Sequence, residues 1–495
     1  MSTASVLATL RPLLSGLPQP VYLVGGAVRD LLLDRESHDL DFVVPDRAIK
    51  TAFKTADFLG LPAYILDRDR DTGRVVMPDG RTLDFARFRG ADLEADLRER
   101  DFTINAMALL VTADEVPLAD ALVDPCDGQR DLGLRLIRQT HDQAIAQDTV
   151  RALRAARLAA DLQFTLHPTT AAAMTAAASQ LTTVSVERVR DELLRLLMAQ
   201  RPAVGLQLLE EADIVAAVLP EIAALSDVGQ SAPHHEAVCA HTRRVLHWLT
   251  RVEAAVVAQQ PEDLPALRLA QRELATFAGP LRACLQQPID GGLTNQTALR
   301  MGALFHDVGK AETQTIEEDG RIRFLGHDAV GAQLAGRRLR QLRLSNELVQ
   351  AVTQIVAGHM RPLLLISATQ PSRRAAYRFF RAFGDNGIAI GLLALADHLA
   401  TYDAPPAAGP TDDAAWERLL AVVATLYAFY FDSYEEVVRP APLLDGRALM
   451  TALKLKSGPE VGRLLDLIEE AQAAGLVHTA EEALALARQE AEKGG

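Results

Sequence analysis

The 495-residue sequence has little of what marks several protein classes. It has only three cysteines, Cys126, Cys239 and Cys284, which are far apart, odd in number and fit no metal-ligand spacing. A disulfide scaffold is therefore excluded. No apolar run reaches the roughly 18 residues that cross a bilayer, and the start has no basic segment of the kind that opens a signal peptide. We expect a cytoplasmic protein with no membrane partner.

Positive charge is also scarce. Lys and Arg number 51 against 65 Asp and Glu, which gives a formal net charge of −14. A negative balance disfavours indiscriminate binding to nucleic acid, and an aromatic content of 5% leaves few side chains for stacking on bases. Any nucleic-acid site must therefore be a local, arginine-rich cleft.

The pattern of elements predicts an α/β head, a small mixed sheet with helices, followed by an all-α remainder. Strand patterns at 21–24, 39–44, 63–67, 74–77 and 81–88 lie in the first 140 residues, with a hairpin turn at 78–80. Helical patterns such as 147–162 and 186–198 dominate from about residue 144. A break at 226–233 and a linker rich in Pro, Ala, Gly and Asp at 404–413 complete the layout. The predicted domains are 1–140, 141–230, 231–402 and 403–495.

A Gly-Gly turn and two spaced carboxylates are the first candidate site. Gly25 and Gly26 stand between a strand and a helix, where the backbone can approach a phosphate closely. Side chains alternate along a strand, so Asp39 and Asp41 share one face. Two such charges repel unless a cation lies between them, and Asp84 on a later strand adds a third oxygen. This set suits two Mg²⁺ ions that activate a 3′-hydroxyl and stabilise leaving pyrophosphate; carboxylates that only face solvent are the alternative.

A helix with arginine at every third position is the second candidate site. Its arginines are Arg151, Arg154 and Arg157, and Asp148 precedes Arg151 by three residues on the same helix face. An Asp–Arg pair can read the edge of a nucleobase, while further arginines meet a triphosphate. A solvated helix with salt bridges is the alternative. Arg188 and Glu192, four residues apart, indicate by themselves only a surface ion pair.

In this order the motifs resemble those of bacterial class II tRNA nucleotidyltransferases, the CCA-adding enzymes and their poly(A) polymerase relatives. The resemblance spans roughly residues 1–220. It rests on Leu23-Val-Gly-Gly-Ala-Val-Arg-Asp, Asp39-Leu-Asp, Arg100-Asp-Phe-Thr-Ile-Asn-Ala, Asp124-Pro…Gly128…Asp131-Leu, Asp148…Arg151 and Arg188…Glu192.

The resemblance implies a role for each matched residue. Asp39 and Asp41 bind Mg²⁺ and, with Asp84, form the catalytic set. Asp148 and Arg151 select the base of CTP or ATP without a nucleic-acid template, and the acceptor is the 3′ end of tRNA. The nucleotide is held by Gly25, Gly26, Arg29, Arg100, Asn105, Arg154 and Arg157, while Arg188 and Glu192 brace the base-reading helix.

Two departures from the family pattern bear on what is added. The family's Glu-Asp-x-x-Arg is Gln147-Asp148-Thr-Val-Arg151 here, so the supporting acid is neutral. Enzymes that add the whole triplet usually have a flexible loop before the Arg100 motif, whereas only residues 90–99 separate Arg89 from Arg100. A short loop resembles relatives that add two cytidines, so CC addition is slightly favoured over CCA addition.

A histidine series is the third candidate site. His306 and Asp307 are adjacent in an apolar segment that we expect to be mid-helix, where neighbouring side chains can reach one metal beside the helix. Burying both without a partner is costly, and a metal would satisfy them. His241 and Asp397 complete a four-ligand set, and His327 and His359 are left for a second metal or a substrate phosphate. A lone histidine on an apolar helix is, by contrast, usually a core residue.

This series resembles that of the HD superfamily of metal-dependent phosphohydrolases. The resemblance implies a divalent transition metal or Mg²⁺, and hydrolysis of phosphate esters such as 2′,3′-cyclic or terminal phosphates on damaged RNA ends. A degenerate domain that binds no metal is the alternative.

Other interpretations of the whole chain remain open. A poly(A) polymerase is expected to be basic near its C-terminus, which this acidic chain is not. An HD phosphohydrolase with a regulatory nucleotide-binding head would not need Asp39 and Asp41. The segment Gly458-Pro-Glu-Val-Gly462 opens an amphipathic helix, which is interpreted first as a packing helix and second as an RNA-contacting tail. The sequence leaves the oligomeric state open.

Overall fold

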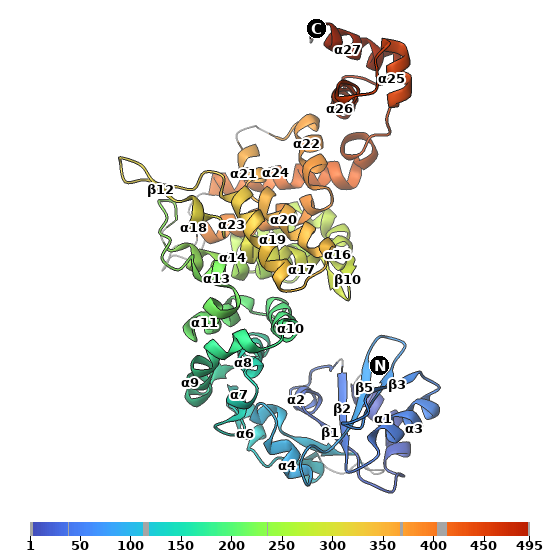
Figure 1. The fold of residues 1–495 in the computed structure, drawn as a ribbon, viewed down its shortest axis with the longest axis vertical. Helices are drawn as coiled ribbons and strands as arrows, with labels where there is room; N and C mark the ends of the chain where they lie inside the picture. Colours follow the sequence, from blue (N-terminus) through green and yellow to red (C-terminus); the bar gives the residue numbers. More distant parts are fainter. Residues whose placement is uncertain are drawn as a thin grey trace. The chain divides into compact units, whose positions relative to one another are not determined.

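The computed structural model describes residues 3–37, 39–111, 118–234, 236–366, 370–402 and 413–493. The chain forms two compact units. Unit 1 holds Met1–Leu196 and Leu208–Val218, and unit 2 holds Leu197–Gln207 and Leu219–Gly495. Figure 1 shows the fold with its elements labelled. Each unit is described separately.

A seven-stranded mixed sheet of order β3-β4-β5-β2-β1-β6-β7 forms the head of unit 1. Its strands are β1 Tyr22–Val24, β2 Asp39–Val44, β3 Ala63–Asp67, β4 Thr72–Val76, β5 Thr82–Arg87, β6 Ala108–Leu110 and β7 Leu122–Val123. β2 and β5 pair in parallel, and the other neighbours are antiparallel. The predicted α/β head is confirmed.

Strand alternation divides the two faces of this sheet between packing and chemistry. Leu40 and Phe42 of β2 point into a hydrophobic core that also includes α1 (Thr3–Leu14) and α3 (Ala48–Leu59). Asp39 and Asp41 alternate with them and lie on the opposite face, which α1 and α3 do not cover. The core therefore fixes the direction in which the carboxylates point.

Helices make up most of the rest of unit 1. They are α2 Gly26–Leu32, α4 Leu93–Arg98, η1 Thr103–Asn105, α5 Leu118–Ala121, α6 Gly128–Gly133, α7 Ala144–Gln147, α8 Val150–Leu162, α9 Pro168–Ala177, η2 Ala178–Thr183, α10 Val186–Leu197, α11 Pro202–Glu211, which runs into unit 2, and α12 Ile214–Val218. The helix expected over 147–162 starts only at Val150, because Asp148 has an extended backbone (φ −146°, ψ 93°) that separates α7 from α8.

Unit 2 is mostly helical, as predicted. Its elements are α13 Pro220–Ala223, α14 Val238–Val252, η3 Glu253–Val257, α15 Pro265–Glu273, η4 Ala275–Phe277, α16 Ala278–Gln286, α17 Asn295–Phe305, α18 Lys310–Thr313, α19 His327–Gln341, α20 Asn346–Gly358, α21 Arg361–Leu365, α22 Arg373–Phe383, α23 Asn386–Tyr402 and α24 Asp413–Asp432. The expectation of no strand after residue 144 is wrong in detail. Short pairs form between β8 (Leu136–Ile137) and β9 (Thr165–Leu166) in unit 1, and in unit 2 between β10 (Pro288–Asp290) and β11 (Leu293–Thr294) and between β12 (Thr315–Ile316) and β13 (Ile322–Arg323).

The C-terminal helices form a small core of their own. They are η5 Tyr434–Val438, α25 Gly446–Leu453, α26 Pro459–Ala473 and α27 Ala480–Lys493. Leu449, Leu464 and Ile468 lie in this core, so Gly458-Pro459 does open a packing helix. Of the linker predicted at 404–413, only the backbone of Asp413, which starts α24, lies within the described residues.

By length and composition α24 is apolar enough to cross a bilayer, and the bent pair α22–α23 passes the same test together. Buried aromatic residues nevertheless tie α24 into unit 2. Trp416 Nε1 donates a hydrogen bond to the Ala266 carbonyl at 3.2 Å, and Tyr427 OH donates one to the Ile388 carbonyl at 2.8 Å. These two bonds join α24 to α15 and α23 of unit 2.

Candidate functional site

The structure brings the three sheet carboxylates together. The parallel register of β2 and β5 places Asp41 opposite Asp84 and Asp39 opposite Thr82. Asp39 Oδ1 accepts a hydrogen bond of 2.8 Å from the Thr82 hydroxyl. Asp84 forms a bidentate ion pair with Arg74, whose Nε and Nη2 each donate to one carboxylate oxygen at 2.6 Å. This pair raises the pKa of the Arg74 guanidinium.

Asp41 is the carboxylate under the greatest electrostatic strain. The side chain of Asp41 lines a cleft. Desolvation by the surrounding protein, followed by repulsion from the charges of Asp84 and Asp39, raises the pKa of Asp41 to about 6. Oxygen donors that repel one another fit a hard divalent cation such as Mg²⁺. Metal binding by Asp39, Asp41 and Asp84 stays a prediction, because Arg74 engages Asp84 and the Thr82 hydroxyl engages Asp39 in this structure.

The Gly-Gly turn brings Arg100 to the edge of this cleft. Gly25 has φ of 73°, and a Cβ at this position would lie 3.1 Å from Arg100 Nη1, so a larger residue would be both strained and crowded. Arg100 is held in turn by Asp96, a carboxylate that is 2% exposed, through bonds of 3.3 and 3.1 Å. Gly26 begins α2 directly after this turn.

Four of the predicted nucleotide-binding residues belong to one hydrogen-bonded chain. Arg29 bonds to Asp30 and donates to Asn105 Oδ1 at 2.7 Å, and Asn105 donates to Asp101 at 3.1 Å. Asp101 and Glu192 together bind Arg154, at 2.9 and 3.0 Å, and Glu192 also binds Arg157 at 2.7 Å. Although burial opposes ionisation, the Arg154 charge keeps the pKa of Asp101 below its usual value.

This hydrogen-bonded network changes the interpretation of the arginines at every third position of α8. Arg154 and Arg157 do not present free guanidinium groups, because carboxylates already engage them. Glu192 braces α8, as the resemblance implies. The local ion pair expected between Arg188 and Glu192 is wrong: Arg188 pairs instead with Asp148 at 2.7 Å. The sequence spacing could not reveal this, since both partners come from other elements.

Asp148 and Arg151 face one cleft; the Arg151 amide donates a hydrogen bond to the Asp148 carbonyl at 2.9 Å, and within the described residues their side chains are not bonded to each other. The cleft has a volume of about 800 Å³, and Asp41, Arg100 and Arg154 also line it. Arg151 donates hydrogen bonds to the backbone carbonyls of Glu99, Arg100 and Ala144, at 3.0, 3.4 and 3.1 Å. Burial lowers the pKa of Arg151, because no carboxylate pairs with it directly. The expected placement of both residues on one helix is wrong, since Asp148 precedes α8.

The histidine series converges inside unit 2. His241 lies in the first turns of α14, His327 begins α19, and Asp397 lies in α23. His306 and His359 each cap the C-terminal end of a helix, α17 and α20. The expectation that His306 and Asp307 lie mid-helix is therefore wrong. A helix end frees both side chains to turn toward the same centre.

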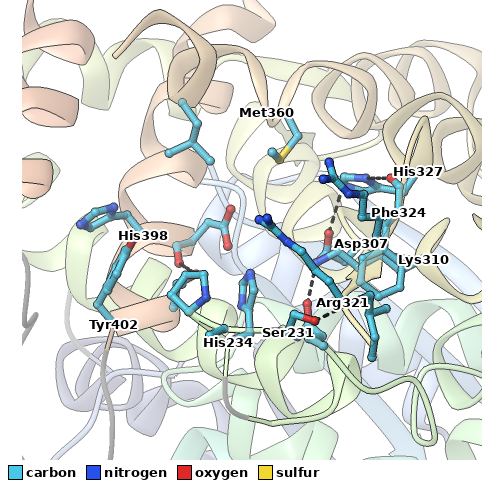
Figure 2. A pocket seen from close by; sticks show the side chains of 18 of the residues that line it. Ser231, His234, Asp307, Lys310, Arg321, Phe324, His327, Met360, His398 and Tyr402 are labelled. Carbon is cyan, nitrogen blue, oxygen red and sulfur yellow. Dashed lines mark hydrogen bonds and ion pairs between the residues drawn. The ribbon is translucent and has the colours of Figure 1, made fainter. Parts of the chain in front are cut away.

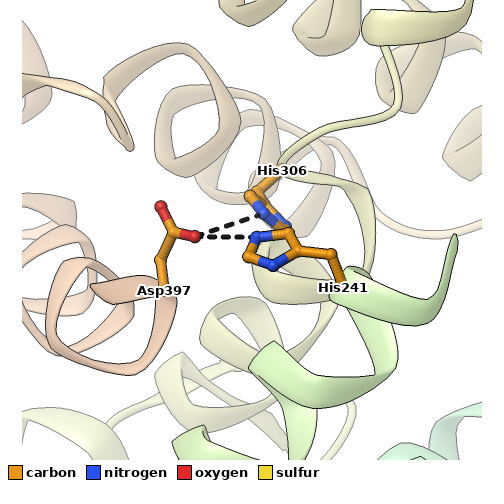
Figure 3. Close-up of side chains that lie close together, drawn as sticks. All are labelled: His241, His306 and Asp397. Atoms are coloured by element: carbon orange, nitrogen blue, oxygen red, sulfur yellow. Dashed lines mark hydrogen bonds and ion pairs between the residues drawn. The ribbon is translucent and has the colours of Figure 1, made fainter. Parts of the chain in front are cut away.

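The six predicted ligands separate into two groups that share Asp307. In each group the ligand atoms lie within 4.8 Å of one another: His241, His306 and Asp397 form one, and Asp307, His327 and His359 form the other. Figure 3 shows the first, with His241 Nε2 at 2.9 Å and His306 Nε2 at 4.0 Å from Asp397 Oδ1. The two oxygens of Asp307 face different groups: Oδ2 lies 3.2 Å from His306 Nε2, and Oδ1 lies 3.4 Å from His327 Nε2.

The histidines are oriented for metal ligation. Their Nδ1 atoms lie 2.7–2.8 Å from backbone carbonyls, in the pairs His306–Ala303, His327–Phe324 and His359–Val356. A neutral imidazole with its proton on Nδ1 has a lone pair on Nε2 for a metal, so His306 must lose its second proton before it can bind one. His306 Nε2 is buried, and the atom beside it is Asp307 Oδ2 at 3.2 Å. Burial, and then the neighbouring His306 charge, lower the pKa of His359 to about 4, so His359 stays neutral near pH 7. These residues fit one or two divalent ions.

Three family models match the chain. One, described as the poly A polymerase head domain, matches residues 21–92 and 71–138, and one described as "Probable RNA and SrmB- binding site of polymerase A" matches 163–225. The HD domain model matches 269–400, a range that contains all the clustered ligands except His241.

Two curated relatives align along nearly the whole chain. A protein named CC-adding tRNA nucleotidyltransferase from Thermus thermophilus is 35% identical over 94% of this chain and 93% of its own length. One named A-adding tRNA nucleotidyltransferase from Deinococcus radiodurans is 34% identical over 98% of each. The chain belongs to the class II tRNA nucleotidyltransferases with an HD domain. A solved structure of the Thermotoga maritima CCA-adding enzyme complexed with tRNA shares the fold at a TM-score of 0.56, with 18% identity over 99% of each chain.

Sequence reasoning missed several residues of this tRNA nucleotidyltransferase. Asp101 and Asp96 hold Arg154 and Arg100 at the cleft of about 800 Å³, and Asp101 stands inside a recognised motif, next to Arg100. Arg89 lines the same cleft, and within the described residues no hydrogen bond or ion pair engages its guanidinium. No pattern signalled Arg89, because its role depends on where the chain turns after β5.

Lys310 and His234 were also missed, in unit 2. Lys310 Nζ lies 2.7 Å from Asp307 Oδ2 and 2.7 Å from Gln230 Oε1. The Lys310 and His306 charges keep the pKa of Asp307 low despite its burial. Both Lys310 and His234 line a pocket of about 680 Å³ that opens over Asp307 (Figure 2).

Proposed function

We propose that this chain adds nucleotides from CTP, and in the case of full CCA addition also from ATP, to the 3′ end of tRNA without a nucleic-acid template. The observation that carries this proposal is the cleft of about 800 Å³ whose lining includes both Asp41 and the pair Asp148 and Arg151. Transfer chemistry and base selection thus share one cavity. The names of the two curated relatives support the same class of reaction. We propose a cytoplasmic location for it.

The reaction is a single displacement at phosphorus. The 3′-hydroxyl oxygen of the tRNA attacks the α-phosphorus, the hydroxyl proton passes to solvent, and the bond to the bridging oxygen of the leaving pyrophosphate breaks. Asp39, Asp41 and Asp84 would hold Mg²⁺, which when bound neutralises charge on the phosphates and lowers the pKa of the hydroxyl. Arg100 lies at the junction of Gly25 and the cleft, where it can bind a phosphate oxygen.

The segment before Arg100 supports a product that stops after two cytidines. Asp92 caps α4 by accepting a bond from the Ala95 amide at 2.8 Å, and buried Asp96 binds both the Arg89 amide and the Arg100 guanidinium. Residues 90–99 are thus a fixed helix and turn. A cleft that recognises two different bases in succession must change shape. Residues 90–99 are held by these hydrogen bonds and do not form a flexible loop that could move to bring about such a change.

Addition of A alone is the second candidate, because the relative from Deinococcus radiodurans has that name and aligns over 98% of this chain. A fixed base pocket suits a single base, whether C or A.

The deciding experiment uses three tRNA acceptors, ending at the discriminator base, in C and in CC, each with CTP alone, ATP alone or both. A CC-adding enzyme extends the first two with CTP and leaves the CC end unextended with ATP. An A-adding enzyme extends only the CC end, and a CCA-adding enzyme completes all three. Long homopolymers of A would indicate a poly(A) polymerase, and no extension at all would contradict nucleotide addition and favour a regulatory head.

We also propose that the HD part of unit 2 hydrolyses phosphate esters with a divalent transition metal or Mg²⁺. His241, His306 and Asp397 would hold one ion and Asp307, His327 and His359 a second, with Asp307 between them. Bound ions would supply a hydroxide from water at neutral pH. The oxygen of that water bonds to phosphorus, the ester P–O bond breaks, and the alcohol leaves with a proton. The position of Asp307, with Oδ2 at 3.2 Å from His306 Nε2 and Oδ1 at 3.4 Å from His327 Nε2, supports this proposal.

The metal is tested directly. Purified protein is dialysed against chelator, each divalent ion is restored singly, and bound metal is measured alongside hydrolysis of 2′,3′-cyclic nucleotides and of 3′-phosphorylated RNA. Stoichiometric metal with hydrolysis supports the proposal. If none of the ions tested binds to the protein, the HD domain is degenerate.

A further inference from the structure

The pocket over the HD cluster has two walls of different chemistry. Figure 2 shows Asp307, Lys310, Phe324 and His327 on one side, and His398 and Tyr402 on the other. Apolar side chains of Met360, Leu363 and Ile366 also line it. At about 680 Å³ it is within the usual size range for a small organic ligand. The walls suit a ligand with a planar or apolar portion as well as an ester at the metal ligands.

Arg321 adds a second site for negative charge at the rim. It belongs to the hairpin of β12 and β13, whose position is fixed because the Ile322 amide donates to the Ser231 hydroxyl at 2.8 Å and the Glu317 amide to the Arg321 carbonyl at 2.8 Å. Within the described residues, no hydrogen bond or ion pair engages the Arg321 guanidinium. Its backbone is anchored while its charge is available.

The neighbouring cations differ from Arg321 in this respect. Arg323, two residues along the same hairpin, is paired with Glu317, and Lys310 is committed to Asp307 and Gln230. Of the Arg and Lys side chains described at the pocket rim, Arg321 is therefore the one that no carboxylate engages. An arginine fork matches the geometry of a phosphate.

We propose that the HD pocket recognises a nucleotide unit with phosphate on both sides of the ribose, and that Arg321 binds the phosphate that is not hydrolysed. The 3′ or 2′ phosphate lies at the cluster of Asp307, the base lies against the apolar wall, and the 5′ phosphate meets Arg321. This inference rests on the proposed HD function and names its substrate class. Both the phosphorylated 3′ end of an RNA and a free nucleoside bisphosphate have this chemistry.

Equilibrium binding tests the proposal without relying on hydrolysis. The full-length protein is titrated with adenosine 3′-monophosphate, adenosine 3′,5′-bisphosphate and a trinucleotide with a 3′ phosphate, with and without divalent ions. A non-reactive CTP analogue in excess keeps the nucleotide cleft of unit 1 filled. We expect the 5′ phosphate to tighten binding about tenfold, the size of effect that one charge-assisted hydrogen-bonded pair gives.

Matched variants assign that gain to Arg321. Arg321→Gln should reduce the preference to less than twofold, Arg321→Lys should retain part of it, and Arg323→Gln should leave it unchanged. Equal affinities of the wild type for both adenosine ligands, or a preference that survives in Arg321→Gln, would overturn the proposal. Preference for the trinucleotide over the bisphosphate assigns RNA ends as the source, and the reverse assigns the free nucleotide. A preserved preference with no hydrolysis would count against the HD activity alone.

Discussion

Replacement of Asp41 by asparagine should abolish nucleotide addition and at the same time stabilise the metal-free head. Asp41 Oδ atoms face Asp84 on the neighbouring strand, and repulsion together with burial raises its pKa from the ordinary 3.8 to about 6. Each tenfold change in a protonation equilibrium is worth about 1.4 kcal/mol. The ionised carboxylate thus destabilises the fold by at most about 3 kcal/mol, and solvent in the open cleft reduces this to about 1 kcal/mol.

The sign fixes the pH window. Because the pKa of Asp41 is higher in the folded than in the unfolded chain, the wild type is favoured below about pH 4 and loses that stability as the pH rises to about 6. Asp41→Asn has no such loss. The variant should match the wild type below pH 4 and exceed it above pH 6, by about 2–4 °C in the melting temperature of unit 1.

Hydrogen exchange at the amides of β1, β2 and β5 in EDTA is the appropriate assay, because a chain of two units need not unfold in one transition. Added Mg²⁺ should slow exchange in the wild type and leave the variant unchanged. Asp39→Asn is the comparison variant: it removes only the weaker of the two repulsions on Asp41 and alters the bond accepted from Thr82, so its gain should be smaller. A variant that is less stable than the wild type at pH 8, or that gains equally from Mg²⁺, would refute the reasoning.

Three further predictions follow from the same geometry. Asp148→Ala should misincorporate UTP or GTP, with a loss of discrimination of about 1–3 kcal/mol in competition assays, and Arg188→Ala should relax selectivity as well because Arg188 holds Asp148; unchanged selectivity with lower turnover would make both residues structural. His306→Ala combined with Asp307→Ala should lose bound metal and ester hydrolysis while nucleotide addition persists, and joint loss of both activities would mean coupling or misfolding. Glu192→Gln should lower the free energy of unfolding of unit 1 by about 3 kcal/mol in urea, because it leaves Arg154 and Arg157 without a shared buried anion. A decrease of less than about 1 kcal/mol would show that the fold of unit 1 does not depend on the Glu192 charge.

The sequence predicted the sheet and its carboxylates because their signal is local. A period of two residues places Asp39 and Asp41 on one face whatever lies around β2. The parallel register that brings Asp84 opposite Asp41 depends on strand order, yet the position of Asp84 in a second alternating strand already indicated it. The limits of the four predicted domains remain predictions.

The partners of the arginines could not be predicted in the same way. The pairing of Arg154 with Asp101 joins residues 53 apart in sequence, and that of Arg29 with Asn105 joins residues 76 apart. Helical spacing within 147–162 suggested a free basic stripe, because it cannot show which distant carboxylates come to lie against it. The sequence could not predict that the HD ligands form two groups around Asp307, since this depends on the direction of each carboxylate oxygen.

An acidic composition is compatible with a function on RNA, because some arginines at the cleft are not neutralised by carboxylates. Asp101 and Glu192 neutralise the inner arginines of α8, so these residues add rigidity to the cleft without adding net positive charge. Arg151 is different, because it is held by neutral carbonyl groups and keeps its full charge at the cleft. Attraction for an anionic substrate therefore comes from a few cations in a confined space, where low dielectric strengthens it. A net charge of −14 over the whole chain then disfavours indiscriminate binding of RNA to its surface.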